Sequence, residues 1–143
     1  MDGSDVIGLS PQVEGLAEFI DWFGGWPTFH DAEVTRVELD RSAPSRIDVF
    51  TFELGDSIGI DGCLSMLKSV LVSFWLEQIQ SLQIQDFNQQ NVLSGLAFTK
   101  APAGFELTLM PCFGLNGVVV ARSVRISFTP VNFAKADGEV GGI

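Results

Sequence analysis

The stretch that decides the fold class reads LAFTKAPAGFELTLM and occupies residues 96–110. It holds two short apolar-rich segments, Leu96–Thr99 and Phe105–Met110. Between them lie Pro102 and Gly104, residue types that are typical of a tight turn. We therefore expect a β-hairpin here, and a sheet that is mostly antiparallel.

Further strands are expected on both sides of this hairpin. Alternating or β-branched apolar residues predict strands at 35–40, 47–54, 70–77, 81–85, 92–99 and 118–129, the last of which would close the sheet. In the first of these, Thr35, Val37 and Leu39 would share one face, opposite a polar face. Glycines and aspartates predict a loop at Gly55–Gly62. Residues 64–71 could instead be helical, although we favour a strand from residue 70 onward.

One helix is expected near the N-terminus. Ser10 is a favourable N-cap and Pro11 suits the first helical position, while Gly24 and Gly25 would end the helix. An apolar stripe follows the helical period, at Val13, Leu16, Ala17, Ile20 and Phe23.

These elements predict an α+β fold, in which one N-terminal helix packs on a mostly antiparallel sheet or sandwich of about seven or eight strands. At 143 residues and 46% hydrophobic content, the chain is expected to form a single domain, residues 1–143, with a real core. Residues 1–9 should form a loose lead-in, and residues 134–143 a disordered tail.

The charge distribution is lopsided, and it limits the classes of partner. The net charge is −10, and residues 1–61 carry all of it, with thirteen acidic residues against three Arg. Nucleic-acid binding is therefore disfavoured, because phosphates require a basic surface. A partner protein with a basic face is favoured, although negative charge could also serve only to keep an apolar domain soluble.

No membrane segment is expected, since the longest apolar run, residues 70–76, is too short and is interrupted by Ser73. The acidic N-terminus lacks the basic start of a secretory signal, so we expect a cytoplasmic protein. Cys63 and Cys112 are far apart in the sequence. We interpret them as buried small apolar residues rather than as a disulfide or metal pair.

Two polar and aromatic islands interrupt the apolar pattern. The first, WPTFHDAEV at residues 26–34, contains the only His of the chain, and the second, DFNQQNVL at residues 86–93, contains four consecutive amides. His30 beside Asp31 could act as a general base, yet neighbouring strand residues point to opposite faces. We favour a structural role, in which the first island plugs the junction of helix and sheet, over a binding surface or catalysis. Four amides exceed what one turn needs, so part of the second island could face a partner.

Motifs for the common chemistries are missing from the sequence. It contains no Walker loop, no dinucleotide fingerprint, no nucleophile elbow and no second His for a zinc site, so we expect no cofactor and no catalytic residue. Asp31 and Glu33 could form a hard-cation site with Asp56 or Asp61, but that loop lacks EF-hand order, so we expect no metal.

Together, the two islands resemble a family of predicted immunity proteins of bacterial polymorphic toxin systems, the one numbered fifty among them. The resemblance spans about residues 20–127, and a trailing F-G-L-x-G at residues 113–117 adds to it. The matching residues of the islands are Trp26, Pro27, Phe29, His30, Asp31, Ala32, Glu33 and Val34, then Phe87, Asn88, Gln90, Asn91, Val92, Leu93 and Leu96.

The resemblance implies a small cytoplasmic protein that binds and neutralises a cognate toxin and performs no catalysis. With the acidic half of the chain, it predicts a toxin that has a basic face. A homodimer through the apolar stretch 62–76 is possible. The alternatives are a small-molecule or peptide binding domain lined by the amides, and a hydrolase that uses His30 and Asp31. The candidate binding residues are Trp26, His30, Asp31, Glu33, Glu38, Asp40, Asn88, Gln90 and Asn91.

Overall fold

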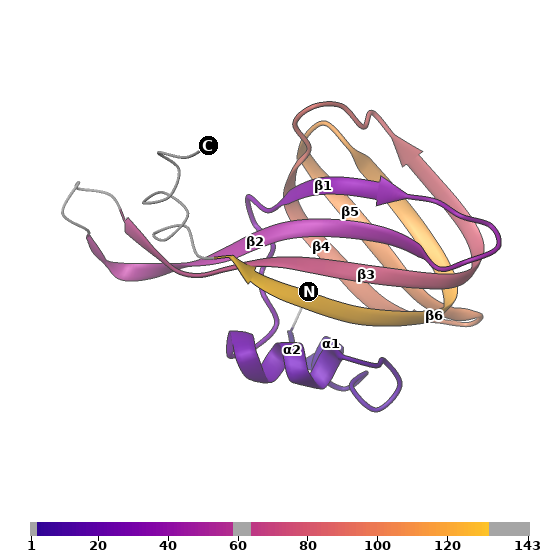
Figure 1. Cartoon of the computed structure of the whole chain (residues 1–143), viewed down its shortest axis with the longest axis horizontal. Coiled ribbons are helices and arrows are strands. Elements are labelled where there is room, and N and C mark those ends of the chain that lie inside the picture. The colour runs from indigo at the N-terminus through magenta and orange to yellow at the C-terminus, as the bar shows by residue number, and fades with distance from the viewer. Residues whose placement is uncertain (1–2, 59–63, 132–143) are drawn as a thin grey trace.

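A computed structural model describes residues 3–58 and 64–131 of the chain. These residues form two short helices and six strands (Figure 1). In chain order the elements are α1 (Gly3–Ile7), α2 (Leu16–Phe23), β1 (Glu33–Glu38), β2 (Ser45–Ile58), β3 (Leu64–Gln85), β4 (Val92–Ala101), β5 (Gly104–Phe113) and β6 (Asn116–Val131).

The strands form a closed antiparallel barrel in the order β1-β2-β3-β6-β5-β4. The barrel closes between β1 and β4, through the single pair Glu33 and Val92. The last predicted strand, 118–129, therefore does not close the sheet, because β6 lies between β3 and β5. The expected α+β class and antiparallel pairing are confirmed, but the expectation of seven or eight strands is wrong.

The strand count was too high because β3 is unusually long. Its 22 residues unite the predicted strands 70–77 and 81–85, and both halves pair with β6. The predicted strands are separated in the sequence by residues 78–80. Here Gln78 has a positive φ of 55° and a bulge lies between Ile79 and Ser81, but the strand continues in the same direction. The predicted loop Gly55–Gly62 is also wrong in part, since β2 continues to Ile58, while residues 59–62 lie outside the described residues.

The 96–110 hairpin is confirmed. In β4 and β5, Leu96 lies opposite Leu109, and the pairing continues to Ala101 opposite Gly104. Gly104 is required at this turn, because a Cβ there would lie 2.2 Å from the carbonyl oxygen of Ala121. The alternation predicted for 35–40 fails at both ends, because a bulge between Val34 and Arg36 leaves Thr35 exposed, and because β1 ends at Glu38, before the exposed Leu39.

The main helix is shorter than predicted. Residues before Gly15 form hydrogen-bonded turns, and the carbonyl of Glu14 accepts a 2.8 Å bond from the backbone N–H of Ile126 in β6. Gly15 then adopts φ 86°, where a Cβ would collide with the Ile126 carbonyl. Because this attachment fixes the chain against β6, the helix begins at Leu16 rather than after Ser10. Its predicted end is confirmed, since Gly24 caps α2 in a left-handed conformation.

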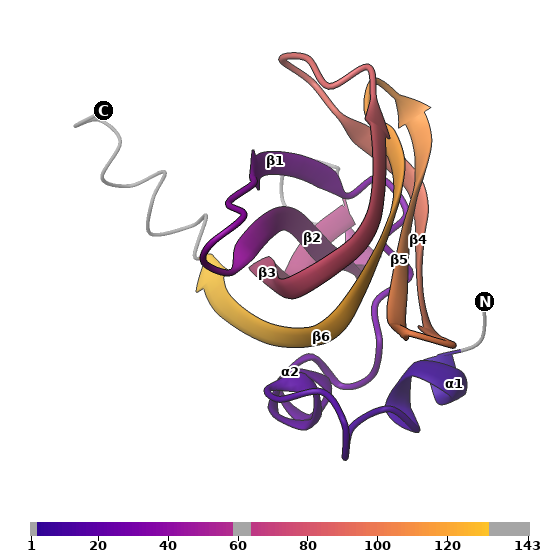
Figure 2. The same cartoon turned by 90° about the vertical axis from the view of Figure 1, so that its right-hand side faces the viewer.

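The N-terminal segment covers one end of the barrel. Figure 2 shows α2 beneath β6 and α1 beside the ends of β4 and β5. The prediction of a loose lead-in is wrong for residues 3–7, which form α1 because Val6 is fully buried in the core. The predicted tail, 134–143, lies outside the described residues. Helices α1 and α2, with five and eight residues, are both far too short to span a bilayer.

The core beneath α2 is a cluster of aromatic rings. Phe19 packs against Phe128 of β6 at 5.3 Å between ring centroids and edge-on against Trp26 at 6.0 Å. Trp26 in turn contacts Phe29 at 5.2 Å and Phe98 at 6.2 Å. In the predicted apolar stripe, Ala17 proves to be exposed, whereas Phe19, which it omitted, is buried. These rings fix the chain that enters the first island.

Candidate functional site

The two islands, more than 50 residues apart in the sequence, lie side by side and close the barrel. The backbone N–H of Asp31 donates to the carbonyl of Leu93 at 2.9 Å, and the N–H of Leu93 donates to the carbonyl of Ala32 at 2.8 Å. Two residues further on, the N–H of Val34 donates to the carbonyl of Asn91 at 2.9 Å. The conspicuous sequence pattern therefore encodes, first of all, the seam between β1 and β4.

Asn91 fastens this seam to the turn between β5 and β6. Its side chain is buried, and Oδ1 accepts bonds from the backbone N–H groups of Asn88 at 2.9 Å and Leu115 at 3.1 Å. Its Nδ2 donates to the carbonyl of Asn88 at 2.8 Å and, more weakly, to that of Val34 at 3.5 Å. An amide suits this position because it supplies donors and acceptors together. Asn91 is inaccessible to a partner.

Asn88 also serves the loop, whereas the Gln side chains do not. The Asn88 side chain donates to the carbonyl of Asp86 at 3.0 Å and accepts from the N–H of Gln90 at 3.0 Å. The side chains of Gln89 and Gln90 are exposed. Neither of the two largest cavities described below is lined by residues 88–91. Of the amide island, only Gln89 and Gln90 are thus free to meet a partner.

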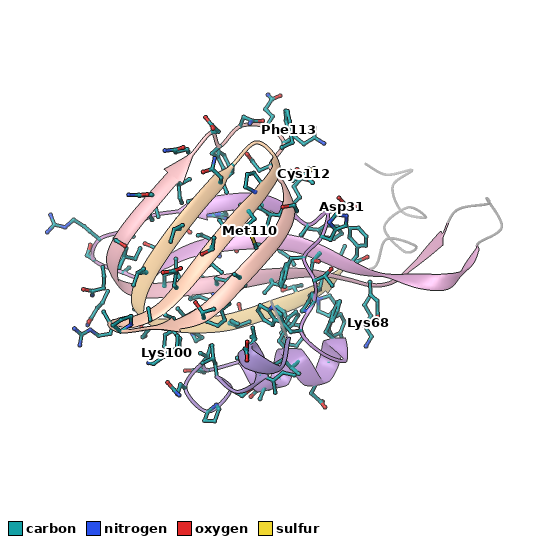
Figure 3. The ribbon with its side chains drawn as sticks, turned by 180° about the vertical axis from the view of Figure 1, so that it is seen from behind. Asp31, Lys68, Lys100, Met110, Cys112 and Phe113 are labelled. Carbon is teal, nitrogen blue, oxygen red and sulfur yellow. The ribbon has the colours of Figure 1, made fainter. Side chains whose placement is uncertain are left out.

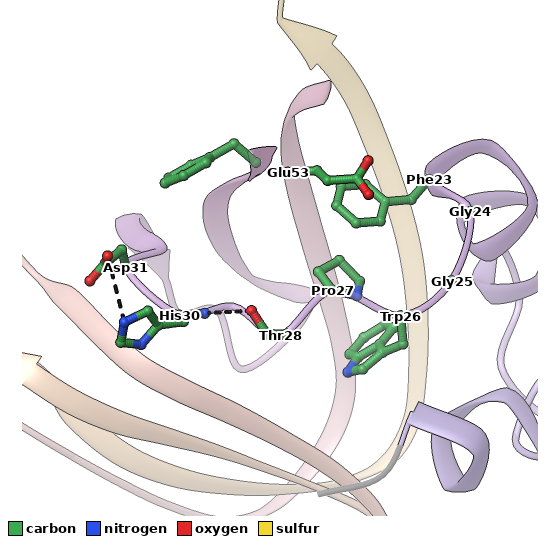
Figure 4. Close-up of a pocket in the computed structure, with 10 residues that line it drawn as sticks. Phe23, Gly24, Gly25, Trp26, Pro27, Thr28, His30, Asp31 and Glu53 are labelled. Atoms are coloured by element: carbon green, nitrogen blue, oxygen red, sulfur yellow. Dashed lines mark hydrogen bonds and ion pairs between the residues drawn. The ribbon is translucent and has the colours of Figure 1, made fainter. Parts of the chain in front are cut away.

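A cleft of about 400 Å³ lies beside the first island (Figure 4). Aromatic rings of Phe23, Trp26 and Phe52 contribute to its wall, together with Pro27, while the carboxylates of Asp31 and Glu53 contribute negative charge. Its residues come from the end of α2, from the first island and from β2. The sequence pointed to Trp26, His30 and Asp31, but it gave no signal for Phe52 or Glu53, which only the closed barrel brings alongside them.

The backbone aims His30 outward. It lies between Phe29 and Asp31, which both have positive φ values, 59° and 65°. Such values are costly for a bulky residue such as Phe, and the burial of its ring holds it there. The His30 side chain is 69% exposed, its Nε2 lies 3.7 Å from the carboxylate of Asp31, and its Nδ1 lies 3.4 Å from the carbonyl oxygen of Ser94.

This arrangement lacks the geometry of a catalytic pair. The His30–Asp31 distance exceeds that of a hydrogen bond, and both side chains are largely exposed to water. The hydroxyl oxygen of Thr28 accepts a 3.2 Å bond from the backbone N–H of His30 and not from its ring.

The candidates on β1 and after it lie away from the cleft. Glu38 is balanced by Arg36 at 3.5 Å and by Arg46 at 3.8 Å. Asp40 organises the turn before β2, because its carboxylate accepts from the N–H of Ser42 at 2.9 Å. Glu33 is half-buried at the barrel seam. Of the nine candidates, the structure brings only Trp26, His30 and Asp31 together around one cavity.

Part of the N-terminal acidity is neutralised on the outer face of β2. Asp48 is buried next to Arg46, whose Nε lies 3.4 Å from Asp48 Oδ1. The guanidinium groups of Arg46 and Arg125 lie over the ring of Trp75, at 5.0 and 4.8 Å from its centroid. This face is therefore internally balanced. Other acids make no ion pair within the described part of the chain, including Glu53 and four on the N-terminal segment, Asp5, Glu14, Glu18 and Asp21.

Exposed apolar side chains adjoin the cleft on the side of β5. Met110 and Phe113 are 38% and 57% exposed, and Cys112 between them is exposed as well (Figure 3). The hydroxyl of Ser94 donates to the carbonyl of Met110 at 3.3 Å, and the carbonyl of Ser94 lies next to His30, so the two surfaces adjoin. The expectation that Cys112 is buried is wrong, because β5 extends past its last pairing with β6 at Leu109. Cys63 lies outside the described residues.

A metal site finds no support among the described side chains. No three His, Cys, Asp or Glu side chains within that part of the chain lie close enough to share an ion. The side chains of Asp56 and Asp61 are not among those described, so their grouping with Asp31 and Glu33 stays a prediction.

Comparison with known proteins found no family model, no curated protein and no solved structure that matches this chain. The likeness of the two islands to the immunity family therefore rests on the motifs themselves.

Proposed function

We propose that this chain is a cytoplasmic immunity protein that binds and neutralises a cognate protein toxin. The observation that carries the proposal is the cleft beside the first island, with its aromatic wall and its carboxylates from Asp31 and Glu53. The sequence likeness of both islands to predicted immunity proteins supports the same function.

The cleft suits a basic side chain of the partner. Asp31 and Glu53 lie on opposite sides of the cleft (Figure 4). A Lys or Arg side chain that entered it would place its charge near one of these carboxylates and beside aromatic rings, and both interactions favour a cation. The cavity volume of about 400 Å³ lies within the range of ordinary ligand sites, so a long side chain fits. The unpaired acids of the N-terminal segment would attract a basic face from a distance and raise the association rate.

The neighbouring apolar surface would be buried from water when the partner binds, and this burial would favour association. Ser94 links the backbone of Met110 to His30 at the cleft, and exposed apolar side chains, such as those of Met110 and Phe113 on β5, are a common feature of protein interfaces. Interfaces derive most of their binding energy from a few buried aromatic and Arg contacts, which here would centre on Trp26 and Phe52.

The rival functions find less support in the geometry. A binding domain lined by the amide island would need a cavity at residues 88–91. The side chains of Asn88 and Asn91 instead form hydrogen bonds with the backbone of the loop and of the neighbouring turn. A hydrolase based on His30 would need a close, sheltered partner for the imidazole, and Asp31 lies too far away in open solvent.

The test uses the polypeptide encoded by the adjacent gene. Expression of that polypeptide alone should stop growth of a host cell, and co-expression of this chain should restore growth. The two purified polypeptides should also form a complex whose affinity falls as salt rises. An adjacent product that is harmless, that does not bind, or that binds equally well in high salt would overturn the proposal.

A further inference from the structure

The C-terminal part of β3 presents an edge that pairs with no second strand of the described chain. Pairing of β3 with β2 begins at Leu76 opposite Ser45, so residues 78–85 pair on one side only, with β6. The only other bond to the backbone of this segment within the described residues is the one that the Gln80 side chain donates to the carbonyl of Gln78, at 3.0 Å. Because alternate residues of a strand point their N–H and C=O groups to opposite sides, this edge offers a row of open donors and acceptors.

The free edge lacks the devices that usually protect such strands. It reads QIQSLQIQ, with no charged residue and no Pro, in a chain whose net charge is −10. Natural edge strands are commonly guarded by charges, Pro or bulges. The bulge between Ile79 and Ser81 guards only the start of the segment and leaves five regularly paired residues, 81–85.

The inner side of the same edge is apolar and incompletely covered. Leu82 and Ile84 are only partly buried, although both pack against the core. Ile79 and Leu82 line a cavity of about 550 Å³ with Leu39, which is 54% exposed, and the turn before β2 adds the charged residues Asp40 and Arg41 to its wall. A strand added at this edge would bring apolar side chains to that cavity.

We propose that this edge pairs with the same edge of a second copy of the chain, forming an antiparallel dimer through residues 81–85. With the twofold axis at Gln83, Leu82 lies opposite Ile84 of the second copy, and Ser81 lies opposite Gln85. Apolar side chains then face apolar ones on the inner side, and amides face amides on the outer side. The absence of charge matters here, because two strongly acidic molecules can approach along this segment without like charges meeting across it.

This dimer leaves the cleft free, because β3 residues 81–85 line no part of it. It is a different surface from the apolar stretch 62–76. A five-residue pairing with a small apolar rim buries less area than a permanent dimer does, so the association is expected to be weak and concentration-dependent.

Charge exchange at Gln83 tests the proposal. Sedimentation equilibrium of the intact chain should show a concentration-dependent shift from a 15.5 kDa monomer to a dimer. In Gln83→Lys and in Gln83→Glu, like charges would meet at the axis, and the dissociation constant should rise by about tenfold or more. An equimolar mixture of the two variants should dimerise again, because the charges are then opposite. Gln83 is exposed, so neither variant disturbs the core.

Thr99→Lys is the matched control, since Thr99 is an exposed residue of β4 and lies away from this edge. Its dimerisation should equal that of the natural chain. A natural chain that remains monomeric at every concentration would overturn the proposal, and so would Gln83 variants that dimerise unchanged or whose mixture fails to recover. A partner strand from another protein on this edge would then be the remaining occupant.

Discussion

The barrel seam depends on one buried amide, so replacement of Asn91 by Ala should be severely destabilising. The change removes three hydrogen bonds of 3.1 Å or less. A protein hydrogen bond contributes about 1 kcal/mol net, and a buried group left without a partner costs about 1–3 kcal/mol. Leu115 is fully buried, so its N–H finds no water in exchange. Together these effects predict a loss of about 3–4 kcal/mol.

The assay is urea unfolding followed by tryptophan fluorescence, with Gln89→Ala as the control. Gln89 belongs to the same amide run, but its side chain is exposed and makes no hydrogen bond within the described residues, so its loss should stay within about 0.5 kcal/mol. A domain of this size has about 5–15 kcal/mol of stability, so the two variants should separate clearly. A loss below about 1 kcal/mol for Asn91→Ala, or one equal to the control, would refute the structural role of this residue.

Two further stability predictions follow from helix and turn geometry. Lys68→Met should cost about 1–2 kcal/mol in thermal unfolding, because the Lys68 ammonium donates to the last carbonyls of α2, at 2.8 Å to Trp22 and 3.0 Å to Phe23. Lys100→Met loses only the contact of its ammonium with the ring of Phe105, so it should cost less. An equal cost for the two would contradict this cap. Gly104→Ala should abolish or severely impair folding, because its Cβ would collide with the backbone of β6. Gly24→Ala has room for a Cβ but keeps a φ of 94°, so it should cost only about 1 kcal/mol in the same thermal unfolding measurement. A mild Gly104→Ala would contradict the close approach of the two strands.

Much of the sheet could be predicted from the sequence, since local patterns determined it. The hairpin at 96–110 and the alternation of Val124, Ile126 and Phe128 depend on neighbouring residues, and both are confirmed. The failures arose where distant contacts prevailed. The bulges in β1 and β3 shift the alternation of side chains, and the bond from Ile126 to Glu14 sets the start of α2. No single-strand pattern contains that information.

Only the part of the candidate site that lies in the first island could be predicted from the sequence. Trp26, His30 and Asp31 stood out because polar and aromatic residues interrupted an apolar pattern, and they do line one cleft. Phe52 and Glu53 lie in an ordinary strand, so nothing in their sequence context marks them. Conversely, Asn91 stood out as strongly as His30, yet its unusual context reflects a buried structural role. An interrupted apolar pattern therefore identifies residues with a specific role, but it does not show whether that role is structural or in binding.

The central claim, that the cleft receives a cationic group of a partner protein, is tested most directly by calorimetric titration with the adjacent gene product. The double variant Asp31→Asn/Glu53→Gln removes both carboxylates of the cleft, and Asp86→Asn/Glu106→Gln removes two outside it, so both raise the net charge equally. The account predicts that the first weakens binding by about tenfold or more and the second by much less. Equal weakening by the two variants, or none by the first, would contradict it.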